Sequence, residues 1–487
     1  MKEELIVIEE GEITVRGNPL FTDLYLQICK GEVLGVVFGN VTDRKCLIEL
    51  FRGEQSLCGG KVFVGNKRTN YEEALIYFKK NATIIEKNSK LIDNLSIEEN
   101  IFLFADENTL VSTRKYKSHL QTMMKKFSLD FSLKRPIGAL TTKEKIVMEL
   151  LKAYYDDKKL VVLNHISGQL LNNDLEDIHE LIKKLTKYGV SFIIIEAFNN
   201  IVFEWVNCFL LIQEGKTTGI FDTDFYNSRQ LYTILMENTK TFGSPTIKKY
   251  IQGTETKNKL PLLEFKNVST SYIHNLNLKL EEGEILNLFF MDDESFEHIL
   301  KLLEGYIKPS SGEISLCGCR LNINSIHQAV DSGICFISES PYENTLFYNM
   351  TLEDNLGLAL SNKVPFYWLK KRYRRSLDFL IEAFHLEDYL HVKLRKLDPR
   401  ILQEVAYLKW YLYAPHLVVC IKPFTDLDIN LLTITKEMIF FLNSRGIAVL
   451  VLSSMLSKNY SVGGDTIYIK NGTAIDESEI YEILYRR

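Results

Sequence analysis

The sequence predicts an α/β protein composed of two tandem domains that are built alike. An internal repeat with a long period divides the chain into two halves. Each half contains continuous apolar runs of strand length separated by helical segments, and each begins with short strands that lead into a strand–turn–helix unit. At 487 residues the chain is too long for one hydrophobic core, so its length also favours more than one domain.

The repeat consists of three segments that return in the same order at a nearly constant offset. A period this long indicates duplicated domains, because solenoid repeats are only about 20–50 residues long. The pairs are Gly31–Leu34 with Gly283–Leu286 (offset 252), Asn94–Asn100 with Asn349–Asn355 (offset 255) and Lys159–Leu163 with His416–Cys420 (offset 257).

Composition excludes several classes of protein. The fractions of hydrophobic (46%) and charged (25%) residues are those of a globular chain, and a formal net charge of −5 gives no general attraction for nucleic acid. Acidic residues interrupt the apolar run of the N-terminal MKEELIVIEEGEI, so it does not read as a signal peptide. No apolar run approaches the roughly 20 residues that span a bilayer. We therefore expect a cytoplasmic protein.

The eight cysteines are scattered, several of them inside apolar strand-like runs, which predicts buried, reduced thiols. Only one glycine separates Cys317 from Cys319, but no second pair with zinc-like spacing accompanies them. We interpret this pair as part of a turn and expect no metal site.

The first strand–turn–helix unit is Gly31–Gly53, with a predicted strand at Val33–Phe38, a polar turn at Gly39–Arg44 and a helix at Lys45–Phe51. This is the frame of a P-loop, in which glycine N–H groups surround phosphates and a lysine neutralises them. The pattern G-x-x-x-x-G-K-[ST] is missing, because Arg44–Cys46 stand where Gly-Lys-Ser/Thr should close the loop. Taken alone, the unit is an ordinary βα turn.

The second unit of this kind is Gly283–Gly305, and its predicted turn holds Asp292, Asp293, Glu294 and Glu297 without glycine or lysine. A turn without glycine cannot readily adopt the left-handed conformations that aim several N–H groups at one anion. Each carboxylate would also repel a phosphate by about 3 kcal/mol at a separation of about 5 Å and an effective dielectric constant of about 20. We therefore do not expect nucleotide binding there.

A mostly helical middle follows in each half, at about 95–155 and 351–413. Buried strands come next, and apolar runs without alternation, separated by helices, predict a parallel sheet covered on both faces. A polar linker at 240–261 separates a first domain at 1–239 from a second at 262–487. The predicted strands are Leu160–Leu163, Phe192–Ile195, Leu417–Ile421 and Ala448–Leu452.

With two P-loop-like frames, two helical middles and two buried strand–turn units, the chain resembles the tandem ATPase subunit of ABC sugar importers of the ribose, galactose and xylose type. The resemblance covers nearly the whole chain, and Gly31–Gly53 and Asn94–Leu103 are among its most specific stretches. It implies two tandem ABC-type P-loop ATPase domains, each with an α/β core, an antiparallel β portion and a helical subdomain.

The resemblance also implies where the nucleotide-site motifs of the first half should lie, and the residues needed for hydrolysis are replaced there. Walker B, for example, should end in Asp-Glu, to serve Mg²⁺ and to polarise the attacking water. The residues at these positions are Gly39, Arg44, Lys45 and Cys46 in the loop, Lys87 at the γ-phosphate-sensing glutamine, Thr141, Thr142 and Lys143 in the signature, Asn164 and His165 in Walker B, and Ala197 at the switch histidine.

The motifs of the second half are replaced in the same way, and Ile421 and Lys422 supply no carboxylate for Mg²⁺ or water. Asp428 is retained at the D-loop position, although an aspartate near a turn is usually a helix cap. The residues at the degenerate positions are Asp292, Asp293, Glu294, Phe296 and Glu297 in the loop, Glu339 at the glutamine, Asp398, Pro399 and Arg400 in the signature, and Ile421 and Lys422 in Walker B.

Three features of the sequence allow more than one interpretation. Arg44 and Lys45 could hold an anion at the helix N-terminus, although solvated charges are the simpler explanation. His165 could be a ligand or a base, but no partner for it stands out in the sequence. The basic and aromatic segment Tyr367–Arg375 could contact a membrane or nucleic acid, or it could be a solvated helix of the helical subdomain.

The first functional hypothesis is a degenerate ABC subunit, a pseudo-ATPase on the inner face of the cell membrane. It would dock on permease-like membrane subunits through the helical middles and the segments Glu86–Leu95 and Glu339–Asn349, as a scaffold or regulator of sugar transport or sensing without ATP hydrolysis. We expect no cofactor, and weak or absent binding of ATP and Mg²⁺.

The alternative hypothesis is a divergent but active ATPase that energises ABC-type carbohydrate import. A weaker third is a soluble interaction protein without a membrane partner. Further partners implied by the resemblance are an extracellular sugar-binding protein or a sensor kinase. The two halves are expected to pair with each other or with a second copy, and no nucleic-acid partner is expected.

Overall fold

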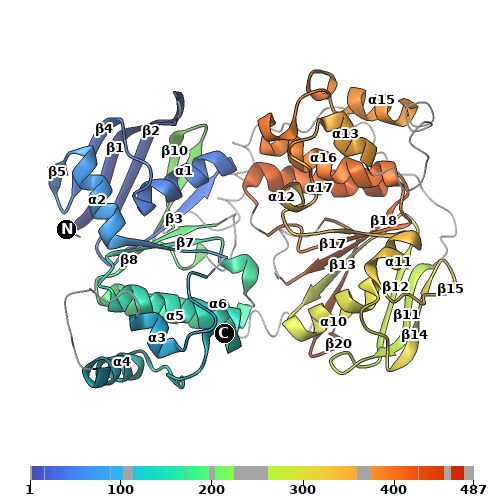
Figure 1. Cartoon of the computed structure of the whole chain (residues 1–487), viewed down its shortest axis with the longest axis horizontal. Helices are drawn as coiled ribbons and strands as arrows, with labels where there is room; N and C mark the ends of the chain where they lie inside the picture. The colour runs from blue at the N-terminus through green and yellow to red at the C-terminus, as the bar shows by residue number, and fades with distance from the viewer. Residues whose placement is uncertain are drawn as a thin grey trace. The chain divides into compact units, whose positions relative to one another are not determined.

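The computed structural model describes residues 3–15, 17–87, 89–102, 113–170, 172–196, 203–223, 261–358, 374–425, 427–454 and 462–475. The chain divides into two compact units, Met1–Thr239 and Lys240–Arg487 (Figure 1). The described residues do not include Ala197, residues 240–260 of the predicted linker, or residues 367–373 of the basic and aromatic segment.

The first unit contains a mixed sheet in which ten described strands lie in the order β5-β4-β1-β2-β10-β9-β3-β8-β7-β6. The five strands from β9 to β6 pair in parallel, whereas β1, β2, β4 and β5 pair antiparallel. The strands are β1 (Glu4–Val15), β2 (Asn18–Cys29), β3 (Val33–Phe38), β4 (Gly59–Val64), β5 (Lys67–Thr69), β6 (Ala82–Ile85), β7 (Leu160–Asn164), β8 (Ser191–Ile195), β9 (Cys208–Gln213) and β10 (Lys216–Asp222).

Helices cover both faces of this sheet. In β7 the side chains of Leu160 and Val162 pack into one hydrophobic cluster, and those of Val161 and Leu163 pack into another on the opposite face. Figure 1 shows α1 and α2 on one face and α5 and α6 on the other. The helices are α1 (Val41–Arg52), α2 (Tyr71–Asn81), α3 (Ile97–Phe102), α4 (Thr113–Phe127), α5 (Thr142–Tyr155) and α6 (Asn172–Lys187), with short 3₁₀ turns at Ile137–Ala139 and Ser167–Gln169.

The second unit repeats this plan with two described sheets. Its core sheet has the order β16-β17-β18-β13-β19-β20, and a separate antiparallel sheet has the order β12-β11-β14-β15. The strands are β11 (Pro261–Ser269), β12 (Leu276–Glu281), β13 (Ile285–Phe290), β14 (Ser311–Leu316), β15 (Cys319–Arg320), β16 (Ile334–Ile337), β17 (Leu417–Ile421), β18 (Ala448–Ser453), β19 (Asp465–Lys470) and β20 (Thr473–Ile475).

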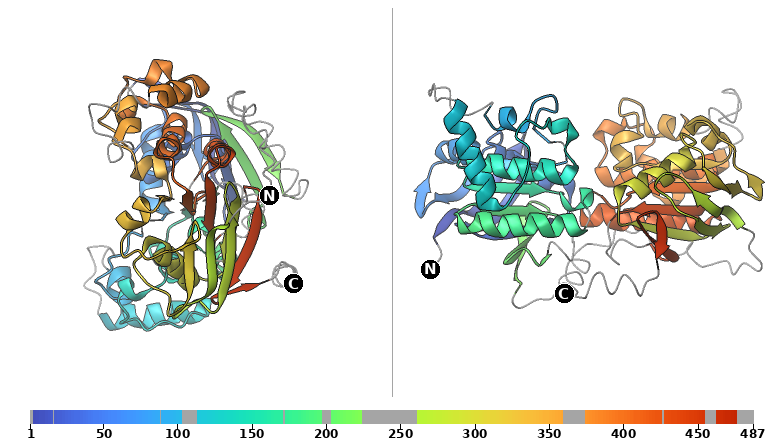
Figure 2. Two further views of the ribbon diagram at one scale, coloured as in Figure 1. Left: turned by 90° about the vertical axis from the view of Figure 1, so that its right-hand side faces the viewer. Right: turned by 90° about the horizontal axis from the view of Figure 1, so that it is seen from below.

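Helices again lie on two sides of the core sheet, with α16 and α17 on one side and α10 and α11 on the other (Figures 1 and 2). The helices of this unit are α10 (Asp293–Glu304), α11 (Ile326–Asp331), α12 (Pro341–Asn344), α13 (Leu352–Leu358), α15 (Arg374–Ala383), α16 (Pro399–Tyr413) and α17 (Ile429–Ser444), with 3₁₀ turns at Glu387–Tyr389 and Leu394–Lys396. The predicted α/β class is confirmed, and within the described residues no helix is long and apolar enough to cross a membrane.

The prediction for the cysteines is partly wrong. Cys46, Cys335 and Cys420 are buried, as expected for thiols in helices and strands of the core, and all eight are free. Cys317 and Cys319 are exposed, because Cys317 lies in the tight turn of the β14–β15 hairpin, as expected for this pair, and Cys319 begins β15. Cys58 is exposed beside β4. Exposure therefore follows position in the fold, not residue type.

Candidate functional site

The connection that should form a P-loop contains only two residues in each unit: Gly39 and Asn40 after β3, and Met291 and Asp292 after β13. The predicted helix start at Lys45 is wrong, because α1 already begins at Val41. A P-loop needs several residues with free N–H groups to surround a phosphate. The backbone of the first helical turn lies where this loop would be.

The residue before each helix explains the early start. The Asn40 side chain accepts a hydrogen bond from the Asp43 N–H at 2.8 Å, and the Asp292 side chain accepts one from the Ser295 N–H at 2.7 Å. Each cap satisfies one of the donors that a phosphate would use. In the second unit, Asp293 and Glu294 therefore lie in the first turn of α10 and not in a loop. Acidic residues are favourable there because of the helix dipole.

The first turn of each helix is also bonded to a hairpin turn of its own unit. In the first unit Asp43 Oδ2 accepts a hydrogen bond from the Gly215 N–H at 2.9 Å, between β9 and β10. In the second, Ser295 Oγ accepts one from the Gly472 N–H at 2.9 Å, between β19 and β20. Asp43 and Ser295 are both the third residue of their helix, so both units make the same connection, which we call the hairpin latch. Burial raises the pKa of Asp43, and its bond to Gly215 opposes the shift.

In the first unit the space between helix α1 and the end of β7 holds charged and polar side chains. Arg44 is buried, so the interpretation as a solvated charge is wrong for Arg44, whereas Lys45 is exposed. His165 follows β7 in a left-handed conformation (φ 50°) and is also buried. Burial and the nearby charge of Arg44 hold the pKa of His165 well below 6.5, so this imidazole is neutral at pH 7.

The sequence did not identify Glu196, which lies directly after β8 and is buried beside His165. Its carboxylate accepts hydrogen bonds from the N–H and the hydroxyl of Ser167, both at 2.8 Å, and Oε2 lies 3.8 Å from His165 Nδ1. An acidic residue directly after the apolar run Phe192–Ile195 was the available signal. Glu196 therefore fixes the turn after β7 through Ser167.

The second unit places a different pair at the equivalent position. Lys422 follows β17 with φ 43°, and its Nζ lies 4.6 Å from the centre of the Phe296 ring on α10. A cation–π contact of this kind contributes about 0.5–2 kcal/mol. In the first unit the cation is Arg44 on helix α1. In the second unit it is Lys422 in the turn after β17. At the expected Walker B position the first unit has Asn164 and His165, and the second has Ile421 and Lys422. None of these four side chains is a carboxylate.

The signature positions begin helices that are capped by their own side chains. Thr141 caps α5 in a capping box with Glu144, whose N–H donates to Thr141 Oγ1 at 3.3 Å. Thr142 is the first residue of that helix, and Lys143 forms ion pairs with Asp174 (2.9 Å) and Asp177 (3.0 Å).

In the second unit Asp398 caps α16, Pro399 is its first residue, and Arg400 Nε donates to Asp398 Oδ1 at 2.9 Å. Asp428 is the cap of α17 and accepts the Leu431 N–H at 2.8 Å. Lys87 and Glu339, which the resemblance assigns to the glutamine positions, are each the second residue after a strand, β6 and β16 respectively.

A different feature is the same in both units and lies in the segments expected to dock on a partner. Ile92 and Phe347 are large apolar side chains with exposed fractions of 42% and 56%, and they occupy equivalent positions of the repeat. A buried asparagine binds the backbone of each. Asn100 Oδ1 accepts the Ile92 N–H at 2.7 Å and Nδ2 donates to the Ile92 carbonyl at 3.0 Å. Asn355 makes the same two bonds to Phe347, at 2.8 and 3.0 Å.

We call this arrangement the asparagine clamp. Asn100 and Asn355 are themselves only 3% and 0% exposed, so their amides are held by the core of each unit. Since each clamp fixes both backbone groups of one residue, the apolar side chain is displayed at a defined place on the surface. A single exposed apolar side chain is ordinary on a protein surface, so the distinctive feature here is that both units hold one at the same place by the same two hydrogen bonds.

The fold and these positions define the class: the chain has the fold of two tandem ABC-type ATPase domains. The sequence is similar to the ribose import ATP-binding protein RbsA of Clostridium perfringens, with 23% identity over 91% of this chain and 89% of that protein. It is also similar to RbsA of Bacillus subtilis, with 21% identity over 96% of this chain and 95% of that protein. No family model matches the chain.

Solved structures agree on the fold over nearly the whole chain. An RNase-L inhibitor superimposes with a TM-score of 0.56 at 14% identity, covering 94% of this chain and 88% of that chain. A chain of a model of ribosome-bound archaeal Pelota and ABCE1 gives a TM-score of 0.59 at 14% identity, covering 96% of this chain and 78% of that one. At this identity the likeness shows the fold alone.

Proposed function

We propose that the chain is the ABC-type subunit of a carbohydrate importer, located in the cytoplasm and docked on membrane permease subunits through its two asparagine clamps. The similarity to ribose import ATP-binding proteins over more than nine-tenths of the chain supports the transport role. The observation that carries the docking role is the identical display of Ile92 and Phe347 by buried asparagines in both units.

The relatives favour the alternative hypothesis of the sequence analysis, an ATPase that energises import, because they are ATP-binding import proteins. ATP turnover by this chain would then use groups other than the expected carboxylates, with Arg44 as the cation nearest to the start of α1. Glu196 is the buried carboxylate at the end of β8, but its oxygens already accept bonds from Ser167.

A second candidate is favoured by a specific observation, the two-residue connections after β3 and β13. With capped N–H groups and hairpin latches, and with His165 and Lys422 in place of a carboxylate residue, a pseudo-ATPase that supports or regulates a permease without hydrolysis fits the local geometry. Both candidates share the permease partner and differ only in whether ATP is bound and hydrolysed.

The docking role is tested by co-purification with permease subunits encoded near the gene, from membranes solubilised in detergent. The double variant Ile92→Asp/Phe347→Asp should lose the permease, because it places charges on the apolar contact. A control is Ile76→Asp/Tyr306→Asp, which adds the same charges at residues that are more exposed (66% and 62%, against 42% and 56%) and lie outside the clamps. Equal recovery of the two double variants would refute the docking role.

Binding of labelled Mg-ATP, and hydrolysis in the presence of the permease, separate the two candidates. Hydrolysis that is lost in Arg44→Ala, but kept in the exposed control Lys45→Ala, would establish the energising role and overturn the pseudo-ATPase. Absence of binding at cellular ATP concentration would establish the reverse.

A further inference from the structure

A lysine lies beside the asparagine clamp of the second unit. Lys409 on α16 is half-buried, and its Nζ lies 5.7 Å from the centre of the Phe347 ring. The same Nζ donates a hydrogen bond to the Thr345 carbonyl oxygen at 3.1 Å. These two contacts hold the ammonium group next to the exposed ring, in the segment proposed to dock on the permease.

The charge of Lys409 has no counter-ion in the described part of the chain. Its contacts are a neutral carbonyl group and a neutral ring, and no described carboxylate forms an ion pair with it. Burial lowers the pKa of Lys409, because its charged form has lost part of its contact with water. A carboxylate brought to this group would meet a cation that is already partly desolvated, so the pair costs less to form than one between two hydrated ions.

The first unit provides an internal comparison, because Lys152 of α5 lies 257 residues before Lys409, the same offset that separates β7 from β17. Lys152 Nζ lies 3.5 Å from the Asp156 carboxylate, four residues further along the chain, and donates to the Ile101 carbonyl oxygen at 3.2 Å. The residue four positions after Lys409 is Tyr413, which supplies no carboxylate. The equivalent lysine is therefore neutralised within the first unit and not in the second.

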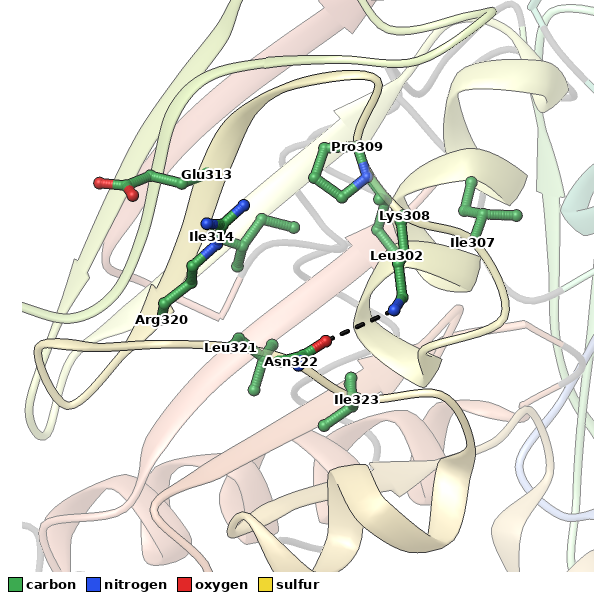
Figure 3. Close-up of a pocket in the computed structure, with 10 residues that line it drawn as sticks. All are labelled: Leu302, Ile307, Lys308, Pro309, Glu313, Ile314, Arg320, Leu321, Asn322 and Ile323. Atoms are coloured by element: carbon green, nitrogen blue, oxygen red, sulfur yellow. Dashed lines mark hydrogen bonds between the residues drawn. The ribbon is translucent and has the colours of Figure 1, made fainter.

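The cations shown in Figure 3 have a different environment. Lys308 and Arg320 line a pocket of about 520 Å³ beside the C-terminal end of α10. Both residues are exposed, and Glu313 lines the same pocket. Ion pairs of exposed groups contribute little, because both ions give up hydration to form them. We therefore assign no partner to these cations.

We propose that the permease presents a carboxylate to Lys409 next to its apolar contact with Phe347, whereas its contact with Ile92 in the first unit needs no anion. This inference rests on the proposed docking role and adds the chemistry of the partner. The segment that meets the second unit carries an apolar side chain with an aspartate or glutamate beside it. The two clamps then take different permease segments, and the charge decides which unit meets which segment.

Titration of the full chain with detergent-solubilised permease subunits encoded near the gene tests the inference. Lys409→Met removes the charge from an unbranched side chain and should weaken binding about tenfold or more, because it leaves the partner carboxylate without a cation. Lys409→Arg keeps the charge and should bind within about threefold of the unmodified chain. The matched control Lys152→Met removes the same charge at the equivalent position and should bind as the unmodified chain does. Urea unfolding of each variant checks that it is folded.

A carbodiimide, which joins an amine to a carboxylate in contact with it, gives an independent readout. It should link Lys409 to an aspartate or glutamate of the permease, as detected by mass spectrometry, and the link should be absent in Lys409→Arg although that variant still binds. The inference is overturned if Lys409→Met binds as tightly as the unmodified chain, if Lys152→Met weakens binding equally, or if the link does not form. In each of these cases, loss of the permease by Phe347→Asp would leave the docking role intact, whereas normal binding of Phe347→Asp would overturn that role as well.

Discussion

Replacing Asn355 by alanine is expected to release Phe347 from its fixed place on the surface of the second unit. The variant removes the acceptor of the Phe347 N–H (2.8 Å) and the donor to the carbonyls of Phe347 and Thr351 (both 3.0 Å). Nothing else in the clamp replaces these bonds, because Asn355 is fully buried and reaches the segment from within the core.

The magnitude follows from the three lost bonds. A hydrogen bond within a protein contributes about 1 kcal/mol net, so the free energy of unfolding of the second unit should decrease by about 3 kcal/mol. The N–H and the carbonyl of Phe347 face the fully buried Asn355. A released backbone group that finds no new partner adds a penalty of about 1–3 kcal/mol, so about 3 kcal/mol is the minimum expected.

The assay is urea unfolding of the full chain, combined with hydrogen exchange of the backbone amides around Phe347. Faster exchange in Asn355→Ala should be confined to the segment between β16 and α13, and Asn100→Ala should have the same effect around Ile92 in the first unit only. Asn344→Ala is the matched control: this exposed side chain makes a bond to Glu339 in the same segment. A loss of stability below about 1 kcal/mol, or unchanged exchange at Phe347, would refute the clamp.

Two further predictions concern titration and the latch. Burial and the neighbouring Glu437 charge raise the pKa of Glu404 to about 8, so the folded protein holds a proton there that the unfolded chain loses near pH 4.5. The free energy of unfolding should therefore fall as the pH rises from 5 to 8, by at most about 5 kcal/mol. In urea titrations the variant Glu404→Gln should not show this pH dependence. An equal pH dependence in the variant would contradict the assignment. Asp43→Ala leaves the Gly215 N–H without its acceptor and should lower the stability of the first unit by about 1–3 kcal/mol in the same assay, whereas an unchanged midpoint would argue against the hairpin latch.

The core strands could be predicted from the sequence because burial on both faces leaves an unbroken apolar run. Val33–Phe38 and Leu417–Ile421 are strands with the predicted bounds. The start of α1 was missed, although Asn40 followed three residues later by Asp43 is a recognisable cap signal. The resemblance to a P-loop favoured a long turn there. Instead the Asn40 cap starts helix α1 at Val41.

The interior of the candidate site could not be predicted from local sequence. Arg44 is an ordinary charged residue at a helix start, and its burial depends on where the ends of β7 and β8 meet α1. The neutral charge state of His165 also depends on its burial and on the nearby Arg44, neither of which the local sequence shows. The asparagine clamp could not be predicted either. Asn100 and Asn355 bond to backbone groups eight residues earlier in the chain, and the periodicity of apolar residues gives no information about such a contact.

The clamp has a consequence for how partner choice can change. On the displayed residue its hydrogen bonds reach only the main chain, so the clamp itself does not constrain which side chain stands there. The two units already differ there, with a branched aliphatic group in one and an aromatic ring in the other. Under the proposed docking role, each unit would thus have one position at which recognition of the partner can be changed by a single substitution that leaves the clamp in place.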